Sequence, residues 1–172
     1  MKKTDNTKFT LRPFRESDAE SIAKYANNPN IAKNLTDAFP NPYGLEDAIR
    51  FLSMAIQNEE PYTLFAIEIN GEACGSIGIF IQSDIHRKSA ECGYWLAEPY
   101  WGQGIIPEAI KQIVDYSFHT FDIVRIYARP FSFNKKSQRV LEKAVFSHEA
   151  TLKKACFKNG EFCDEMIYSI IK

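Results

Sequence analysis

The spacing of apolar residues along the chain predicts alternating helices and strands. Apolar residues recur at helical spacing in residues 18–27, 45–58, 104–119 and 134–144. Short apolar or alternating runs predict strands at 9–12, 62–69, 73–82, 89–97 and 123–129. The Asn-Gly pairs at 70–71 and 159–160 predict tight hairpin turns. The resulting order, β-α-α-β-β-β-α-β-α-β-β, predicts an α/β fold with a mixed, mostly antiparallel, twisted sheet.

Two of these segments carry more specific expectations. The helix at 45–58 is expected to bury one apolar face, formed by Leu45, Ala48, Ile49, Leu52, Ala55 and Ile56. The preceding stretch, residues 28–44, is rich in proline and asparagine, so we expect a long loop with at most one helical turn. Long loops in compact domains are often functional, and this loop is a candidate cover for a substrate.

Composition narrows the class of protein. The chain has 172 residues, of which 45% are hydrophobic and 25% charged, values typical of one globular domain. A net charge of −1 gives no argument for a nucleic-acid partner or an anionic membrane. The first residues lack the apolar core of a signal peptide, and no run reaches the roughly 18–20 apolar residues of a membrane span. We therefore expect a cytoplasmic protein.

The four cysteines do not suggest a metal site. They stand at Cys74, Cys92, Cys156 and Cys163, with no C-x-x-C pair among them. Cys156 and Cys163 flank the Asn-Gly turn at 159–160 symmetrically, so a two-residue hairpin would place them opposite each other. In a cytoplasmic protein we expect these thiols to be reduced.

The most specific signal is a glycine-rich turn between a strand and a helix. Residues 100–110 read Tyr-Trp-Gly-Gln-Gly-Ile-Ile-Pro-Glu-Ala-Ile. Such a turn directs several backbone N–H groups to one place, and the helix dipole adds partial positive charge there. Neither the dinucleotide-binding pattern G-x-G-x-x-G nor the P-loop pattern is met. The turn predicts a phosphate-bearing cofactor bound at residues 102–106.

Three motifs together resemble those of the GNAT acetyltransferase superfamily, in the branch related to ribosomal-protein N-terminal acetyltransferases. They are Leu-Arg-Pro-Phe-Arg at 11–15 with Asp18, Gly-Tyr-Trp-Leu at 93–96 followed by the turn at 100–104, and Asn-x-x-Ser-x-Arg-Val-Leu-Glu-Lys at 134–143. The resemblance spans residues 9–171. It implies a single-domain GNAT-like fold with helices on both faces of the sheet and a splayed central strand pair. It also implies acetyl-CoA as co-substrate, with no metal. The chain departs from the pattern at Ile106, where a small residue is usual, and at Val145, where glycine usually precedes the phenylalanine.

The resemblance assigns cofactor contacts residue by residue. It implies that Gly102, Gln103, Gly104, Ile105 and Ile106 hold the pyrophosphate. Backbone groups of Trp95, Leu96 and Ala97 would pair with the pantetheine arm, as an added strand would. Asn134 would bond a pantetheine amide; an ordinary helix N-cap is the alternative, and the two roles are compatible.

Two residues are candidates for proton transfer. Glu91 lies on a central strand and suits a general base acting through water; a structural ion pair, for instance with Arg129, is the alternative. Ser137 stands one helical turn after Asn134 and is the candidate acid for the departing thiolate; an ordinary exposed helix serine is the alternative. Many superfamily members carry a tyrosine acid where this chain has Leu141, so that acid is excluded here.

The leading functional hypothesis is an acetyl-CoA-dependent N-acetyltransferase that acetylates a primary amine by direct attack. The branch favours a protein N-terminal α-amine, while small amines and antibiotics stay open as acceptors. A catalytically silent CoA-binding domain and a plain interaction module are the competing hypotheses. A homodimer is compatible with the sequence but not decided by it.

Overall fold

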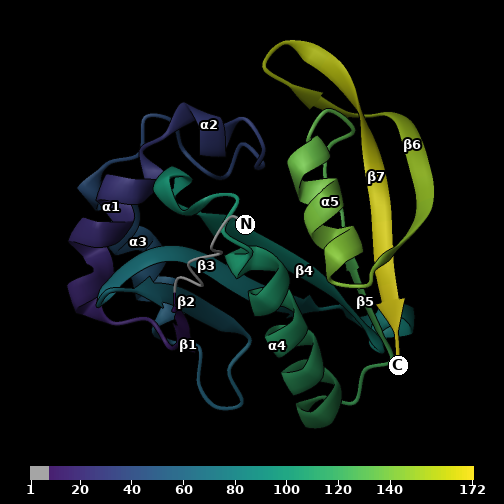
Figure 1. Cartoon of the computed structure of the whole chain (residues 1–172), viewed down its shortest axis with the longest axis horizontal. Helices are drawn as coiled ribbons and strands as arrows, with labels where there is room; N and C mark the ends of the chain where they lie inside the picture. Colours follow the sequence, from purple (N-terminus) through teal and green to yellow (C-terminus); the bar gives the residue numbers. More distant parts are fainter. Residues whose placement is uncertain (1–7) are drawn as a thin grey trace, which may run out of the picture. The chain divides into compact units, whose positions relative to one another are not determined.

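The computed structural model describes residues 8–172, which form two compact units. Unit 1 comprises the described residues up to Gly78 together with Tyr94–Ala109, and unit 2 comprises Ile79–Gly93 and Ile110–Lys172. Figure 1 labels the helices and strands. Strands β3 (Glu72–Ile81) and β4 (Ser89–Leu96) and helix α4 (Ile105–Thr120) contribute residues to both units.

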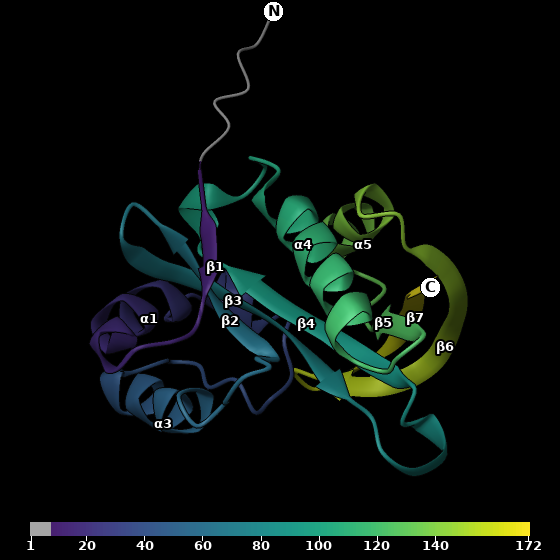
Figure 2. The same cartoon turned by 90° about the horizontal axis from the view of Figure 1, so that it is seen from below.

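Unit 1 contains an antiparallel ladder and two helices that share one core. Strand β1 (Thr10–Arg12) pairs with β2 (Leu64–Ile69), and β2 pairs with β3. Helices α1 (Ala19–Ala26) and α3 (Leu45–Ala55) lie side by side (Figures 1 and 2), and α2 (Pro29–Ala32) is the single turn expected within the 28–44 loop. The core cluster of this unit consists of Phe14, Ile22, Ala26, Tyr43, Ala48, Leu52, Ala55, Ala66 and Ala73.

The predicted apolar face of α3 is only partly correct. Ala48, Leu52 and Ala55 are buried, whereas Leu45, Ile49 and Ile56 are each at least 40% exposed. At about 100° per residue, the buried three fall within an arc of about 60°, and the exposed three lie beside that arc. The helix therefore presents a narrow stripe to the core, and the broader apolar face predicted from the sequence is wrong.

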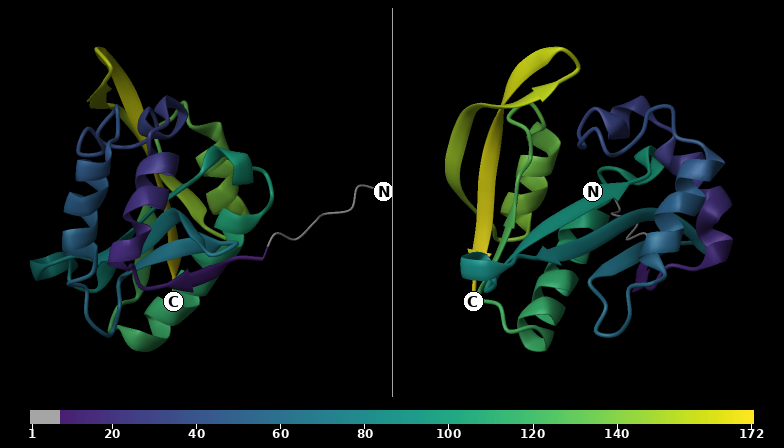
Figure 3. Two further views of the ribbon diagram at one scale, coloured as in Figure 1. Left: turned by 90° about the vertical axis from the view of Figure 1, so that its left-hand side faces the viewer. Right: turned by 180° about the vertical axis from the view of Figure 1, so that it is seen from behind.

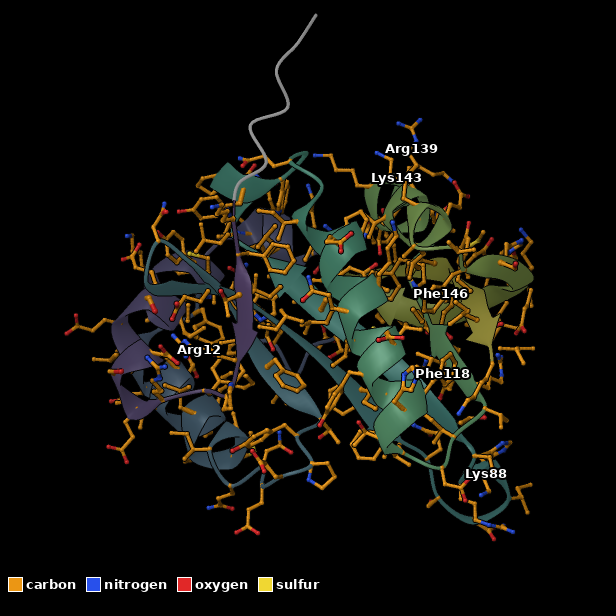
Figure 4. All side chains as sticks on the ribbon, turned by 60° about the horizontal axis from the view of Figure 1, so that its bottom comes forward. Arg12, Lys88, Phe118, Arg139, Lys143 and Phe146 are labelled. Atoms are coloured by element: carbon orange, nitrogen blue, oxygen red, sulfur yellow. The ribbon has the colours of Figure 1, made fainter. Side chains whose placement is uncertain are left out.

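A buried ion pair joins β1 to the start of α1. Two nitrogens of Arg12 (labelled in Figure 4) each donate to one carboxylate oxygen of Asp18 at 2.8 Å, and Arg12 Nε also donates to Glu68. Burial alone would raise the pKa of Asp18, but hydrogen bonds from Arg12 and from the Arg15 amide, together with the Arg12 charge, hold that pKa below its usual value. The Leu-Arg-Pro-Phe-Arg motif with Asp18 is thus explained structurally, by a satisfied charge pair.

Unit 2 is built on the pairing of β5 (Arg125–Ala128) with its neighbours. The register of β5 with β4 is parallel, from Ser89↔Arg125 to Glu91↔Tyr127, while β4 itself continues to Leu96. β5 pairs antiparallel with β7 (Glu161–Ile171), which forms a long hairpin with β6 (Ser147–Lys158), seen clearly in Figure 3. The strand order is β1-β2-β3-β4-β5-β7-β6, which confirms the predicted mixed, mostly antiparallel sheet.

Helix α5 (Lys135–Lys143) is strongly amphipathic. Gln138 and Leu141 are buried, whereas Arg139 and Lys143 project outward (Figure 4). The helix ends in a Schellman motif, in which the Phe146 amide donates to the Leu141 carbonyl and the Val145 amide to the Glu142 carbonyl, both at 3.0 Å. Val145 occupies the left-handed position of this motif with φ of 69°. A β-branched residue is strained there, because glycine normally takes this conformation.

Among the described residues, every helix is too short or too polar to cross a membrane. In the same part of the chain, no three His, Cys, Asp or Glu side chains gather as the ligands of a metal would.

Candidate active site

The glycine turn of unit 1 has the backbone conformation that its sequence predicts. Gly102 and Gly104 have φ of 77° and 80°, and α4 begins at the next residue, Ile105. A Cβ atom on either glycine would meet no heavy atom within 4 Å, so the positive φ, not crowding, is what requires glycine. The space beside both glycines is therefore open.

Ile106, which departs from the family pattern, is packed inside the protein. Its residue is only 8% exposed, and the preceding Ile105 is also buried. Both side chains thus anchor the first turn of α4. Pro107 follows in that same turn, where a missing N–H costs no intrahelical hydrogen bond.

The strand end before the turn is held by three hydrogen bonds. The Ala97 amide donates to the Cys74 carbonyl at 2.7 Å, and the Trp101 indole N–H donates to the Leu96 carbonyl at 2.7 Å. The side chain of Gln103 donates to the Pro99 carbonyl at 3.0 Å. Because neighbouring residues of a strand point their N–H groups to opposite edges, the Leu96 amide is directed to the edge opposite Cys74. Trp95 is half-buried at this strand end.

In unit 2, Glu91 forms the ion pair that was the alternative to a catalytic role. Its two carboxylate oxygens accept from Nε and Nη2 of Arg129, each at 3.0 Å. Nη1 of the same guanidinium lies 3.8 Å from Glu165 Oε2. The bond with Glu91 raises the pKa of Arg129, although burial acts in the opposite direction. A base role for Glu91 would therefore operate within this charge network.

Asn134 forms the helix cap that the sequence suggested. Its Oδ1 accepts from the Ser137 amide at 3.1 Å at the N-terminus of α5. Because an amide oxygen has two lone pairs, Asn134 could contact a ligand amide through Oδ1 as well as through its NH₂ group while it caps α5. Gln138, which is buried, donates to the carbonyls of Phe131 and Ser132 and so fixes the loop that leads to Asn134.

Several other side chains of unit 2 have defined surroundings. Phe131 is buried and Phe133 is exposed, and their rings stack with centroids 5.3 Å apart. Leu141 is fully buried, as its place on the core face of α5 requires. Burial, followed by the nearby charge of Glu91, raises the pKa of the Cys92 thiol to about 12, which argues against Cys92 as a nucleophile.

Sequence reasoning missed one cluster in unit 1. The carboxylate of Glu98 accepts hydrogen bonds from the side-chain amides of both Asn28 and Asn30. The sequence shows these asparagines only as part of a polar loop, and no local spacing connects them with Glu98, which lies about seventy positions away. The Cα register of the final hairpin, by contrast, pairs Cys156 with Cys163 as predicted, and both are free thiols.

Comparison with known proteins identifies the family. The acetyltransferase (GNAT) domain matches residues 8–147. The chain is 30% identical over 172 residues to the uncharacterized N-acetyltransferase YoaA of Bacillus subtilis (strain 168), covering 98% of this chain and 96% of that protein. It is also 30% identical over 173 residues to the putative ribosomal N-acetyltransferase YdaF of the same strain, covering 97% and 93%.

Among solved structures, the Microcin C7 self immunity acetyltransferase MccE, in complex with acetyl-CoA and AMP, is similar to this chain. It superposes with a TM-score of 0.81 at 25% identity, covering 95% of this chain and 92% of MccE. The domain match, the near full-length relatives and the shared fold agree with the glycine turn found here. The chain belongs to the GNAT acetyltransferase family and is an acetyl-CoA-dependent N-acetyltransferase.

Proposed function

We propose that this enzyme acetylates the α-amine at a protein N-terminus by direct attack on acetyl-CoA. The proposed use of acetyl-CoA rests on the turn at Gly102 and Gly104. Both glycines have positive φ angles, and α4 begins directly after them. The acceptor is supported by the near full-length likeness to a putative ribosomal N-acetyltransferase.

In unit 1, the proposed cofactor grip uses backbone groups. Amides of Gly102, Gln103, Gly104, Ile105 and Ile106 would bond the pyrophosphate, with the dipole of α4 adding to the attraction. Trp95, Leu96 and Ala97 would line the pantetheine arm. Leu96 would pair with it along the edge to which its amide is directed, since the Ala97 amide donates to Cys74. The Leu96 amide is our candidate for polarising the thioester oxygen.

In unit 2, the proposed roles concern protons. The acceptor nitrogen attacks the thioester carbonyl carbon, and collapse of the tetrahedral intermediate releases the CoA thiolate. Glu91, through water, would take the proton from the amine. Ser137 would give its hydroxyl proton to the sulfur and take one back from solvent water. The side-chain NH₂ of Asn134 would bond a pantetheine carbonyl while its Oδ1 caps α5.

We also propose that the catalytic domain extends over residues 9–171, beyond the matched domain's end at 147. The support is the pairing of β7 with β5, which runs from Ala128↔Tyr168 to Arg125↔Ile171.

We further propose that the protein is cytoplasmic and forms a homodimer. Light scattering after size-exclusion chromatography tests the dimer, and fractionation of cells that produce the tagged protein tests the location.

A small-molecule acceptor is the second candidate, favoured by the likeness to MccE, a self immunity acetyltransferase. A panel of acceptors separates the two. It contains short peptides with different free N-terminal residues, the same peptides with the N-terminus blocked, free amino acids, and spermidine as a polyamine.

The readouts of the panel are release of CoA thiol and the mass of the product. We expect turnover with at least one free peptide and none with its blocked partner. Turnover confined to the small amines would assign the second candidate. CoA binding without turnover on any amine would instead favour a catalytically silent domain. The variants Glu91→Gln and Ser137→Ala then test the proposed base and the proposed acid in the same assay.

A further inference from the structure

A carboxylate in unit 1 holds the start of the 28–44 loop. The side-chain amide of Asn28 donates to Glu98 Oε2 at 2.6 Å, and that of Asn30 lies 3.2 Å from both carboxylate oxygens. Asn28 also caps α2 by accepting from the Asn30 amide at 2.8 Å. Glu98 is therefore bonded to the two side chains that open the loop, and hydrogen bonds to an ionised carboxylate are the stronger kind.

The far end of the same loop rests on the strand end beside Glu98. The ring of Phe39 lies 6.0 Å from that of Trp95 and 5.0 Å from that of Tyr43, measured between centroids. Within the loop, the side chain of Asn34 donates to the Asn30 carbonyl at 2.9 Å. The loop is thus attached to residues 95–98 at two points, one aromatic and one charged.

Those attachment points belong to the segment that we propose to hold the cofactor. Glu98 directly follows Ala97, and its carbonyl accepts from the Trp101 amide at 3.1 Å in the turn that leads to the glycines. A ligand that orders residues 95–104 would act on the groups to which the loop is attached. By linkage, an ordered loop would in turn favour the ligand.

We propose that Glu98 is a positioning residue that latches the 28–44 loop onto residues 95–104, so that acetyl-CoA binding and order in the loop are coupled. The coupling rests on the proposed cofactor site, whereas the latch itself does not. Neither Glu98 nor the two asparagines touch the reacting atoms in this account.

Tryptophan fluorescence gives a direct readout of the latch. The chain has two tryptophans, Trp95 and Trp101, and both lie in the latched segment. The test variant is Glu98→Gln, which keeps the side-chain shape but removes the charge and one acceptor. The matched control is Glu46→Gln, which makes the same chemical change at an exposed position of α3.

Without cofactor, we expect acrylamide to quench the emission of the Glu98→Gln protein more strongly than that of wild type or Glu46→Gln. Amide exchange in residues 28–44 should accelerate about tenfold, because bonds to a charged group are lost. Acetyl-CoA should slow that exchange in the wild-type protein and much less in Glu98→Gln.

A second variant distinguishes loss of the latch from misfolding of the Glu98→Gln protein. In Glu98→Gln with Asn30→Asp, the new amide at position 98 can donate to the new carboxylate at position 30, so quenching and exchange should return toward wild type. The latch is overturned when Glu98→Gln quenches and exchanges like Glu46→Gln, or when the double variant is worse than the single one. Failure of the cofactor site shows separately, as acetyl-CoA that changes neither emission nor exchange in the wild-type protein.

Discussion

Replacing Val145 by glycine should stabilise the protein. Val145 closes the Schellman motif after α5 with φ of 69°, a conformation that costs a residue with a Cβ about 1–2 kcal/mol, and more for a β-branched one. Glycine adopts this conformation without strain, which is why it dominates this position in helices. The Val145→Gly change leaves both capping hydrogen bonds in place, since they use only backbone groups.

Two smaller costs oppose the gain. Val145 is 70% exposed, so about a third of a buried valine's 1.5–3 kcal/mol is at stake, roughly 0.5–1 kcal/mol. Glycine also adds freedom to the unfolded chain, at roughly 0.5–1 kcal/mol. The two costs together amount to about 1–2 kcal/mol. Strain of about 2–3 kcal/mol, the upper part of the range for a residue in a left-handed conformation, exceeds them and leaves a net stabilisation of about 1 kcal/mol. For a domain of this size that corresponds to a rise in Tm of about 2–4 °C.

Urea unfolding of the wild type, Val145→Gly and Val124→Gly measures the effect. Val124 is a matched control, because it is also exposed but does not have a positive φ, so its replacement should destabilise by about 1 kcal/mol or more. Val145→Ala should bring little gain, since alanine keeps the part of the strain that any Cβ causes. A Val145→Gly protein that is destabilised as much as Val124→Gly would refute the reasoning.

Three further changes test other parts of the structure. Asp18→Asn should cost about 3 kcal/mol in urea unfolding, because it removes the buried carboxylate from Arg12 and leaves Glu68 as its ionic partner. The pKa of Asp18 is lowered by folding, so its contribution is present above about pH 4 and is lost as the pH falls through the folded value; the variant should lack this acid loss. Gly104→Ala forces a Cβ into φ of 80° and should weaken acetyl-CoA binding about tenfold by calorimetry, with the fold retained. Glu91→Gln should lower kcat about 100-fold or more as a lost base would; lower stability with unchanged kcat would assign Glu91 to its ion pair with Arg129 alone.

The sequence correctly predicted the structural features that depend on a local pattern of residues. The order of helices and strands, the hairpin register at Cys156 and Cys163, and the turn at Gly102 and Gly104 each follow from short-range spacing or from glycine's access to positive φ. The resemblance of the motifs also predicted the family, because those motifs encode local features such as the capped start of α5 at Asn134.

The features that the sequence did not predict depend on distant neighbours. No local pattern could say that Leu45 and Ile49 of α3 would lie outside the packed stripe, since that depends on what covers the helix. The bonds from Glu98 to the loop asparagines join residues about seventy positions apart. The ion pair of Glu91 could not be predicted from local pattern, because its partner Arg129 follows β5 and lies 38 positions away.

The most direct test of the account is the thermal stability of the wild type and of Gly104→Ala with and without acetyl-CoA. A ligand at about 100 times its Kd adds about 2.7 kcal/mol to a folded protein, which raises Tm by roughly 5–11 °C at this size. We predict such a rise for the wild type and about half of it for Gly104→Ala at the same acetyl-CoA concentration, because tenfold weaker binding leaves about 1.4 kcal/mol of stabilisation. A wild-type Tm that does not change, or an equal rise in both proteins, would contradict the claim that the glycine turn holds the cofactor.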